Sequence, residues 1–255
     1  MTLKVWTAPE VHLLASNRPR AGWEALFPAR EWLDQDTEPV AESDRLCETA
    51  GRLCYGSFGS PRPGGNKAYL ARIKEQGHGE VLEFASATLL LRGLSFSCAR
   101  QLTRYRTFSF CQRSSRFCDE GQIGVICPPA VAALGRQHPV YETWWKDAVD
   151  SVCSYEHLKE CLKAEGTLSR KEVNEAARSL LPQCAATELV AQANMRGWRH
   201  LLEQRCSAHA DAEVRRVACA AFGVLRELAP ELLSDYTPTV LPDGSFTLST
   251  PHKKV

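Results

Sequence analysis

A run of arginines between Arg92 and Arg116 is the part of this sequence whose residue types best predict chemistry. It holds six arginines and no Asp, Glu or Lys, although the whole chain is balanced, with 31 basic and 30 acidic residues. Two hydroxyls, Ser114 and Ser115, lie within it. Arginine carries a planar fork of donors that grips phosphate and carboxylate groups. The segment therefore predicts a site for an anionic small molecule, most simply a phosphate ester.

The same segment can also be interpreted as the solvated face of an ordinary helix or strand, since runs of charge usually lie on the surface. It contains Phe108, Phe110 and Phe117, however, which makes it too apolar for a free tail. Because burying an unpaired charge is costly, these arginines need anionic partners from elsewhere in the protein or from a ligand.

Two further segments could converge with the arginines. The first is G-H-G-E-V-L-E at 77–83, and the second is N-M-R-G-W-R-H-L-L-E-Q-R-C-S-A-H at 194–209. On a continuous helix, Arg196 and His200 are i,i+4 neighbours, as are Arg205 and His209. The spacing predicts two cation-capable pairs, although each residue alone is more often an ordinary helix side chain.

The elements that must position these residues follow from apolar spacing and from turn residues. We expect strands over 3–14, 83–94, 107–117, 123–129 and 187–193. We expect helices over 42–54, 66–76, 140–165, from Ser95 to about 103, from Ser169 to Pro182, and over 196–232 as two helices or one bent helix. Few antiparallel strands with many helices indicate an α+β fold. We expect one domain over 1–235 and a loosely held, proline- and threonine-rich tail over 236–255.

Composition limits the class of protein. The 255 residues are 44% hydrophobic, enough to bury a core. No stretch reaches the ~18 apolar residues of a membrane span, and no signal-peptide pattern opens the chain, so we expect a cytoplasmic protein. The net charge of +1 argues against wholesale nucleic-acid binding. Eleven cysteines without a C-x-x-C pair, and seven dispersed histidines, lead us to expect no metal site.

Four motifs occur in order over roughly residues 45 to 235. They are G-H-G-E-V-L-E-F-A from residue 77, R-Y-R-x7-S from Arg104 to Ser114, E-A-A-R-S-L-L-P at 175–182, and the 194–209 segment. They resemble the G-H-x-S-x-x-E-H, R-H-R-x7-S, E-x-A-R-x-x-L-P and N-x-R-x-x-x-x-F-x-x-x-R motifs of the flavin-dependent thymidylate synthases (ThyX). The resemblance implies a ThyX-like fold, with a small antiparallel sheet and several long helices, assembled as a homotetramer with active sites shared between subunits.

The resemblance also implies the reaction and its residues. FAD would be the cofactor, and methylenetetrahydrofolate and NADPH the co-substrates, for methylating dUMP at C5 without a cysteine nucleophile. Arg205, beside the pyrimidine, and Ser114 would be catalytic. The positions that hold the nucleotide match Gln101, Gln112, Ser114, Ser115, Arg116, Arg178 and Arg205. The positions that contact the flavin match His78, Arg104, Tyr105, Arg106, Asn194, Arg196, His200 and His209.

This chain departs from the family pattern at several motif positions. Tyr105 replaces a histidine, Gln112 replaces a carboxylate, and Glu80 stands where Ser or Thr usually approaches the flavin phosphates. We therefore expect a specialised member, similar to the polyoxin-pathway methylase of nucleoside-antibiotic biosynthesis, that acts on UMP, dUMP or both. The alternatives are an ordinary dUMP-specific synthase, a flavin enzyme that makes another C5 product, and a non-catalytic nucleotide- or RNA-binding protein that uses the Arg104–Arg116 patch.

Overall fold

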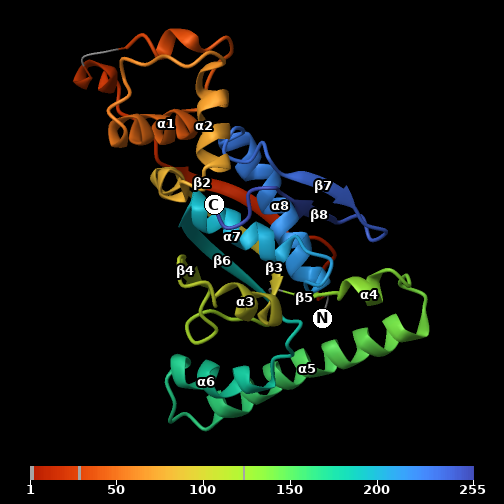
Figure 1. Ribbon diagram of the computed structural model, residues 1–255. Helices are drawn as coiled ribbons and strands as arrows, with labels where there is room; N and C mark the ends of the chain where they lie inside the picture. The colour runs from red at the N-terminus through yellow and green to blue at the C-terminus, as the bar shows by residue number, and fades with distance from the viewer. Residues whose placement is uncertain (1–2, 28–29, 123) are drawn as a thin grey trace.

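A four-stranded antiparallel sheet in the order β2-β3-β6-β4 forms the centre of the molecule (Figure 1). The computed structural model describes residues 3–27, 30–122 and 124–255. Two small sheets accompany the central one: β1 pairs with β5 in parallel, and β7 pairs with β8 antiparallel. The strands are β1 (Val5–Trp6), β2 (Glu10–Ser16), β3 (Ser86–Ser95), β4 (Ser109–Gln112), β5 (Val125–Ile126), β6 (Ala186–Asn194), β7 (Thr237–Val240) and β8 (Phe246–Ser249).

Several of the helices begin at a residue whose side chain accepts a backbone N–H of the first turn. The α-helices are α1 (Glu42–Cys54), α2 (Gly65–Glu75), α3 (Phe96–Leu102), α4 (Pro129–Ala132), α5 (Pro139–Ala164), α6 (Arg170–Ala177), α7 (Met195–Arg205) and α8 (Ala212–Leu228). The 3-10 helices are η1 (Trp23–Leu26), η2 (Leu33–Gln35), η3 (Gly79–Phe84) and η4 (Arg178–Leu180). The Ser95 hydroxyl accepts the Cys98 N–H at 2.9 Å at the start of α3. Ser169 and Glu172 form a capping box at the start of α6.

The core lies between the central sheet and two helices. Side chains of β3 and β6 alternate between buried and half-buried, as expected of a sheet with one covered face. Helix α7 packs on β6, and α8 packs on β2 and β3 (Figure 1). Trp198 of α7 is 1% exposed and donates its indole N–H to the Ala87 carbonyl at 3.1 Å. This packing fixes the N-terminus of α7 at the end of β6.

Gly93 lies at a bulge in β3. The register with β6 shifts between Leu91 and Leu94, and Gly93 has a φ of 65°. A Cβ there would lie 2.7 Å from the Trp6 ring. Glycine is needed because both the backbone conformation and the close approach exclude a side chain.

Helices α5 and α6 form an antiparallel pair below the sheet (Figure 1). Only one stripe of α5 is buried, and its Ala148 and Val152 pack with Leu3 and Val125 in a second hydrophobic cluster. The turn from α6 through η4 leads into β6, so this pair places residues of α6 and η4 beside the start of that strand.

The C-terminal segment differs from the loosely held tail expected from its composition. It forms the β7–β8 hairpin, and the Leu248 N–H donates to the Cys206 carbonyl at 2.9 Å. Val255 is 6% exposed and belongs to the main hydrophobic cluster. The hairpin is held by contacts with distant parts of the chain, which its own composition does not reveal.

The expected mixed fold with a small antiparallel sheet is confirmed. The 196–232 region forms two helices, and the expected helical pairing of Arg205 with His209 is wrong. Helix α7 ends at Arg205, and Asp211 begins α8 by accepting the Glu213 and Val214 N–H groups at 2.9 and 3.3 Å. Across the residues that the structure describes, no helix is both long and apolar enough to cross a membrane.

Candidate functional site

Three of the six arginines between Arg92 and Arg116 find acidic partners within the chain. Arg92 pairs with Glu188 at 2.9 Å, Arg113 with Glu120 at 3.1 Å, and Arg116 with Glu175 at 2.8 Å. The other three are exposed, and no ion pair is found for them among the described residues: Arg100, Arg104 and Arg106. These three guanidinium groups are therefore available to an anionic ligand.

Tyr105 links the arginine segment to α7. It is buried, and its hydroxyl accepts a hydrogen bond from Arg205 Nε at 2.9 Å while donating to Gln204 Oε1 at 2.9 Å. Gln204 in turn contacts His200 Nε2 at 3.1 Å. Burial raises the pKa of Tyr105 above its usual value, so the phenol stays protonated near neutral pH. The side chain that replaces the motif histidine thus fixes the Arg205 guanidinium in place.

A cavity of about 430 Å³ opens at the N-terminus of α7, and we call it the α7 cavity. Three of the residues predicted to contact the flavin line it, namely Asn194, Arg196 and His200. Asn194 caps α7 by accepting the Gly197 N–H at 2.9 Å. Arg196 donates to Glu83 at 2.7 Å, and both side chains are 43% exposed. The rest of its wall is Glu83, Thr107, Gly197, Lys254 and Val255.

A second cavity of about 470 Å³ adjoins the first, and we call it the tail cavity. The two share His200 and Lys254 in their walls. The tail cavity lies between the end of α7 and strand β8, and His209 lines it. Three of the residues predicted to contact the flavin thus line the α7 cavity, and a fourth, His209, lines the tail cavity.

The His78 side chain pairs with Tyr55. Its Nδ1 is 2.6 Å from the Tyr55 hydroxyl, and the two rings stack at a centroid distance of 5.6 Å. It lines a separate cavity of about 280 Å³ against α2. His78 shares no cavity wall with the other predicted flavin positions, although its neighbour Gly79 lies against the Arg196 side chain, where a Cβ would be 2.8 Å from Nε.

A fourth cavity, of about 670 Å³, lies between α3, α6 and η4, and we call it the α6 cavity. Arg178 Nη1 donates to the Ser115 hydroxyl at 3.3 Å, and both line the wall. Arg100 also lines it and donates to Gln183 at 3.4 Å. Glu175, the partner of Arg116, completes the polar part of the wall. Two guanidinium groups for which no acidic partner is found among the described residues, together with a hydroxyl, are donors from which a phosphate monoester accepts.

The remaining predicted nucleotide positions do not line a described cavity. Gln112 donates to the Thr187 hydroxyl at 3.4 Å, and the Ser114 hydroxyl accepts the Arg116 N–H at 3.4 Å. Gln101 is half-buried in α3. Both serines and Arg116 belong to the turn that follows β4, so this turn brings the expected residues next to α6.

Strand β6 separates the α6 cavity from the α7 cavity. Gln183 lies just before the strand and Asn194 ends it. Nine residues at ~3.3 Å per residue place the two ends roughly 26 Å apart. A single chain therefore presents two distinct groups of predicted site residues rather than one.

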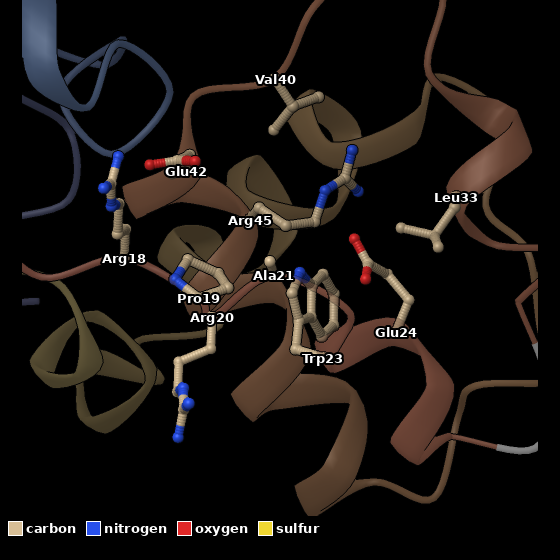
Figure 2. Close-up of a pocket in the computed structure, with 10 residues that line it drawn as sticks. All are labelled: Arg18, Pro19, Arg20, Ala21, Trp23, Glu24, Leu33, Val40, Glu42 and Arg45. Atoms are coloured by element: carbon tan, nitrogen blue, oxygen red, sulfur yellow. The ribbon is translucent and has the colours of Figure 1, made fainter.

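A further cavity of about 720 Å³ lies in the N-terminal region and contains none of the predicted site residues (Figure 2). Its wall mixes acids with arginines, among them Arg18, Glu24, Glu42 and Arg45. Arg45 already pairs with Asp36 and, at 3.0 Å, with Glu48. We assign no ligand to this cavity, because none of the predicted site residues lines its wall.

Sequence reasoning missed several wall residues. Glu83 lies inside the quoted G-H-G-E-V-L-E segment, and Glu175 begins E-A-A-R, so both motifs contained the signal. For Lys254 and Val255 the sequence holds no such signal, because no local pattern predicts that the segment after the hairpin folds back onto α7. Over the described ranges, no group of three or more His, Cys, Asp or Glu side chains forms a metal site.

The comparisons with known proteins agree with the motifs. Residues 37–231 match the family model described as thymidylate synthase complementing protein. The flavin-dependent thymidylate synthase of Mycobacteroides abscessus is 40% identical over 88% of this chain and 90% of its own length. That of Corynebacterium diphtheriae is 37% identical over 89% of this chain and 93% of its own length.

Among solved structures, the fold is similar to that of PolB, a UMP/dUMP methylase from Streptomyces cacaoi bound with 5-Br dUMP. The TM-score is 0.67 at 19% sequence identity, over 91% of this chain and 96% of that one. This likeness confirms the expected fold.

Proposed function

Because this chain belongs to the family of flavin-dependent thymidylate synthases, we propose that it methylates the uracil ring of UMP or dUMP at C5. Methylenetetrahydrofolate would supply the carbon and NADPH the hydride, while C5 loses a proton and tetrahydrofolate and NADP⁺ are released. The observation that carries the proposal is the α7 cavity, where Asn194, Arg196 and His200 of one motif line a single wall. We also propose that residues 1–235 form one catalytic domain, against which residues 236–255 pack.

The residues present fit FAD. The α7 and tail cavities each lie within the ~300–1,000 Å³ of cofactor pockets. The helix N-terminus at Asn194 carries a partial positive charge that favours anions. Gly197 has no Cβ, and one placed there would meet Asn194 and Ala193 at 3.3 Å, so glycine keeps this wall open. When bound, the flavin supplies the redox chemistry, and the protein orients it.

The α6 cavity would hold the nucleotide phosphate. Arg178, Arg100 and the Ser115 hydroxyl converge there, and charge-assisted hydrogen bonds from guanidinium to phosphate are strong and directional. Glu175 pairs with Arg116 and orients that side chain at the rim. A carboxylate in the wall repels a dianion less when it is already neutralised by such a pair.

Arg205 would act on the pyrimidine. A uracil that accepts carbon at C5 gains negative charge on its carbonyl oxygens, and a fixed cation stabilises that charge. Arg205 Nε donates to the Tyr105 hydroxyl at 2.9 Å, and that hydroxyl is itself oriented by donating to Gln204 Oε1 at 2.9 Å. Because these donors and acceptors are already in place, little reorganisation is needed when the charge develops.

We propose that the complete active site forms between copies of the chain in a homotetramer. The α6 and α7 cavities lie at opposite ends of β6, roughly 26 Å apart by strand length. That distance exceeds the length of a nucleotide. A nucleotide bound through Arg178 therefore meets a flavin bound at the α7 cavity only if a second chain supplies one of the two.

The test gives purified protein dUMP and UMP in parallel, each with methylenetetrahydrofolate and NADPH, and analyses the product by mass. A gain of one methyl group on either nucleotide supports the proposal. The relative amounts of the two products give the selectivity between UMP and dUMP. A gain of a hydroxymethyl group would identify a different C5 product. Colourless protein that forms no product and binds polyanions in a salt-dependent way would refute the enzymatic assignment and favour nucleic-acid binding.

A further inference from the structure

Lys254 has an unusual backbone conformation at the junction of the α7 and tail cavities. Its φ is 64°, and it is the only non-glycine residue with a positive φ among those that the structure describes. A lysine in this left-handed region is strained, and such residues persist only where their surroundings enforce them. The surroundings of Lys254 must therefore hold it in place.

Glu203 of α7 supplies the direct restraint. The Lys254 N–H lies 3.2 and 3.1 Å from the two carboxylate oxygens of Glu203. The Tyr236 hydroxyl donates to the same carboxylate at 3.2 Å. The backbone of Lys254 is thus fastened to the helix whose N-terminus forms the α7 cavity.

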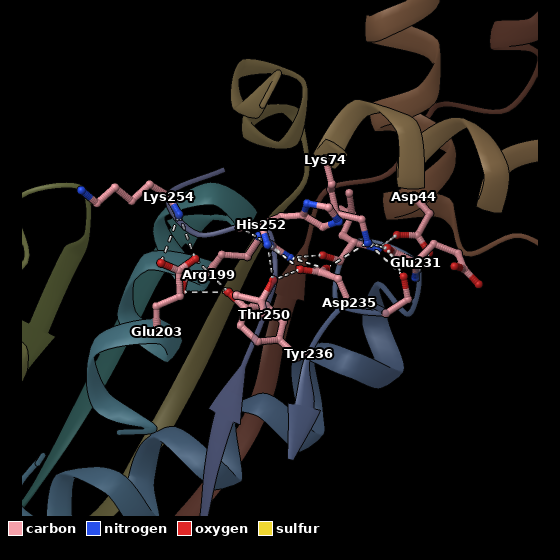
Figure 3. Close-up of polar contacts among 12 residues, drawn as sticks. Asp44, Lys74, Arg199, Glu203, Glu231, Asp235, Tyr236, Thr250, His252 and Lys254 are labelled. Atoms are coloured by element: carbon pink, nitrogen blue, oxygen red, sulfur yellow. Dashed lines mark hydrogen bonds and ion pairs between the residues drawn. The ribbon is translucent and has the colours of Figure 1, made fainter. Parts of the chain in front are cut away.

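A buried polar network fastens the rest of the tail (Figure 3). The Asp235 carboxylate accepts from Arg199 at 2.7 and 2.8 Å, from Lys74 at 2.9 Å, and from the Thr250 hydroxyl. Arg199 also donates to the His252 carbonyl at 3.2 Å. The segment that leads to Lys254 is therefore held on both sides of the β7–β8 hairpin.

The side chain of Lys254 is not part of that network. Figure 3 shows it extending away from the dashed contacts, with the ammonium group at its far end. Over the described parts of the chain, this ammonium makes no ion pair. In the α7 cavity, Glu83 is already paired with Arg196, so Lys254 contributes a positive charge that the chain does not balance.

We propose that Lys254 binds the pyrophosphate of the dinucleotide cofactor, whose two halves occupy the α7 and tail cavities. Lys254 and His200 are the two residues that line both cavities, so they lie where the middle of an elongated ligand must pass. In a dinucleotide that middle is the pyrophosphate, and an ammonium group is a suitable partner for it. This inference rests on the proposed function, in which the cofactor is FAD, and it makes the tail part of the cofactor site.

The test measures FAD affinity of apoprotein by flavin fluorescence, for the wild type, Lys254→Ala and Lys254→Arg. Lys146→Ala is the matched control, because it removes the same charge from an exposed lysine of α5 that lines neither cavity. We expect at least tenfold weaker FAD binding for Lys254→Ala, near wild-type binding for Lys254→Arg, and less than a threefold change for Lys146→Ala. Riboflavin, which has no phosphate, should bind the wild type and Lys254→Ala equally.

Equal FAD affinity of the wild type and Lys254→Ala would overturn the inference while leaving the proposed function intact. Equal losses for Lys146→Ala and Lys254→Ala would also overturn it, because they indicate a general charge effect. An anaerobic arm follows reduction of the bound flavin by NADPH. A weaker NADPH dependence in Lys254→Ala with unchanged FAD affinity would assign the ammonium to the other dinucleotide and refute the FAD site. Wild-type protein that binds no FAD would instead refute the proposed function.

Discussion

Tyr105 occupies a position where the family motif has histidine, and its hydroxyl is the only atom that distinguishes it from phenylalanine. We expect Tyr105→Phe to lower kcat by roughly tenfold, because Arg205 Nε loses an acceptor at 2.9 Å and its orientation is no longer fixed. Stability should fall by about 1 kcal/mol, the usual net contribution of one hydrogen bond. Steady-state kinetics and thermal unfolding of the two proteins check both values.

Two controls separate orientation of Arg205 from other effects of the substitution. Arg205→Ala should remove turnover while the protein keeps its yellow colour, because Arg205 does not line the α7 cavity. Tyr55→Phe removes a comparable tyrosine hydroxyl from the His78 pair instead. Unchanged kcat in Tyr105→Phe would show that the hydroxyl does not orient Arg205.

Asp44 gives the stability a pH dependence that can be isolated. Its buried carboxylate accepts the Glu231 and Leu232 N–H groups at 3.0 and 3.1 Å, and burial raises its pKa from 3.8 to about 6. The folded state therefore binds the proton more tightly than the unfolded chain, and this group lowers the free energy of unfolding as pH rises from about 4 to 6. We expect the difference in free energy of unfolding, wild type minus Asp44→Asn, to fall by at most about 3 kcal/mol over this range.

Urea unfolding of both proteins at several pH values measures that difference. Other carboxylates titrate equally in the two proteins and cancel, so the slope belongs to residue 44. Above pH 7 the difference should be constant, because Asp44 is then ionised in both states. Parallel stability curves from pH 4 to 7 would contradict the assignment.

At the scale of elements, the β7–β8 hairpin depends on a few buried charges. Asp235→Asn should destabilise the protein by roughly 3–5 kcal/mol, because Arg199 and Lys74 keep their charges while losing the carboxylate between them. Both cations are almost fully buried. We expect a lower Tm and faster proteolysis within 236–255. Thermal unfolding measures the first, and mass analysis of the fragments measures the second.

The matched control lies in the same hairpin. Asp243→Asn removes a carboxylate that pairs with Arg215 at 2.9 Å but is itself partly exposed, so its loss should cost far less. Equal effects of the two substitutions would mean that the buried network does not fasten the tail.

The elements predicted correctly are those with local signals. Ser95 and Ser169 are N-caps that act within three residues, and Gly93 marks a bulge because of its own backbone conformation. The hairpin was not predicted, because Asp235 meets Arg199 and Lys74 across long sequence separations. The end of α7 was also missed, since Cys206 carries no glycine or proline signal and the break depends on Asp211 capping the next helix.

The candidate site also has parts that the sequence predicts and parts that depend on the tertiary fold. Motif order in the sequence identified Arg178 with Ser115, and Asn194 with Arg196 and His200, as groups of functional residues. It could not show that β6 holds these groups at opposite ends, because that depends on how the sheet is assembled. Lys254 was missed for a related reason, since its position depends on the tertiary fold of the hairpin.

The separation of the two cavities at the scale of the whole molecule makes a prediction about assembly. Arg178→Ala damages the α6 cavity and Arg196→Ala damages the α7 cavity, so each variant alone should be nearly inactive. If one site takes the α6 cavity of one chain and the α7 cavity of another, co-expressed variants should recover roughly a quarter of wild-type sites in a random mixture. Activity per chain of the co-purified oligomer measures this recovery. Co-expressing Arg178→Ala with Arg100→Ala, both in the α6 cavity, should restore nothing. A mixture of Arg178→Ala and Arg196→Ala that stays as inactive as its parents would contradict a site shared between chains.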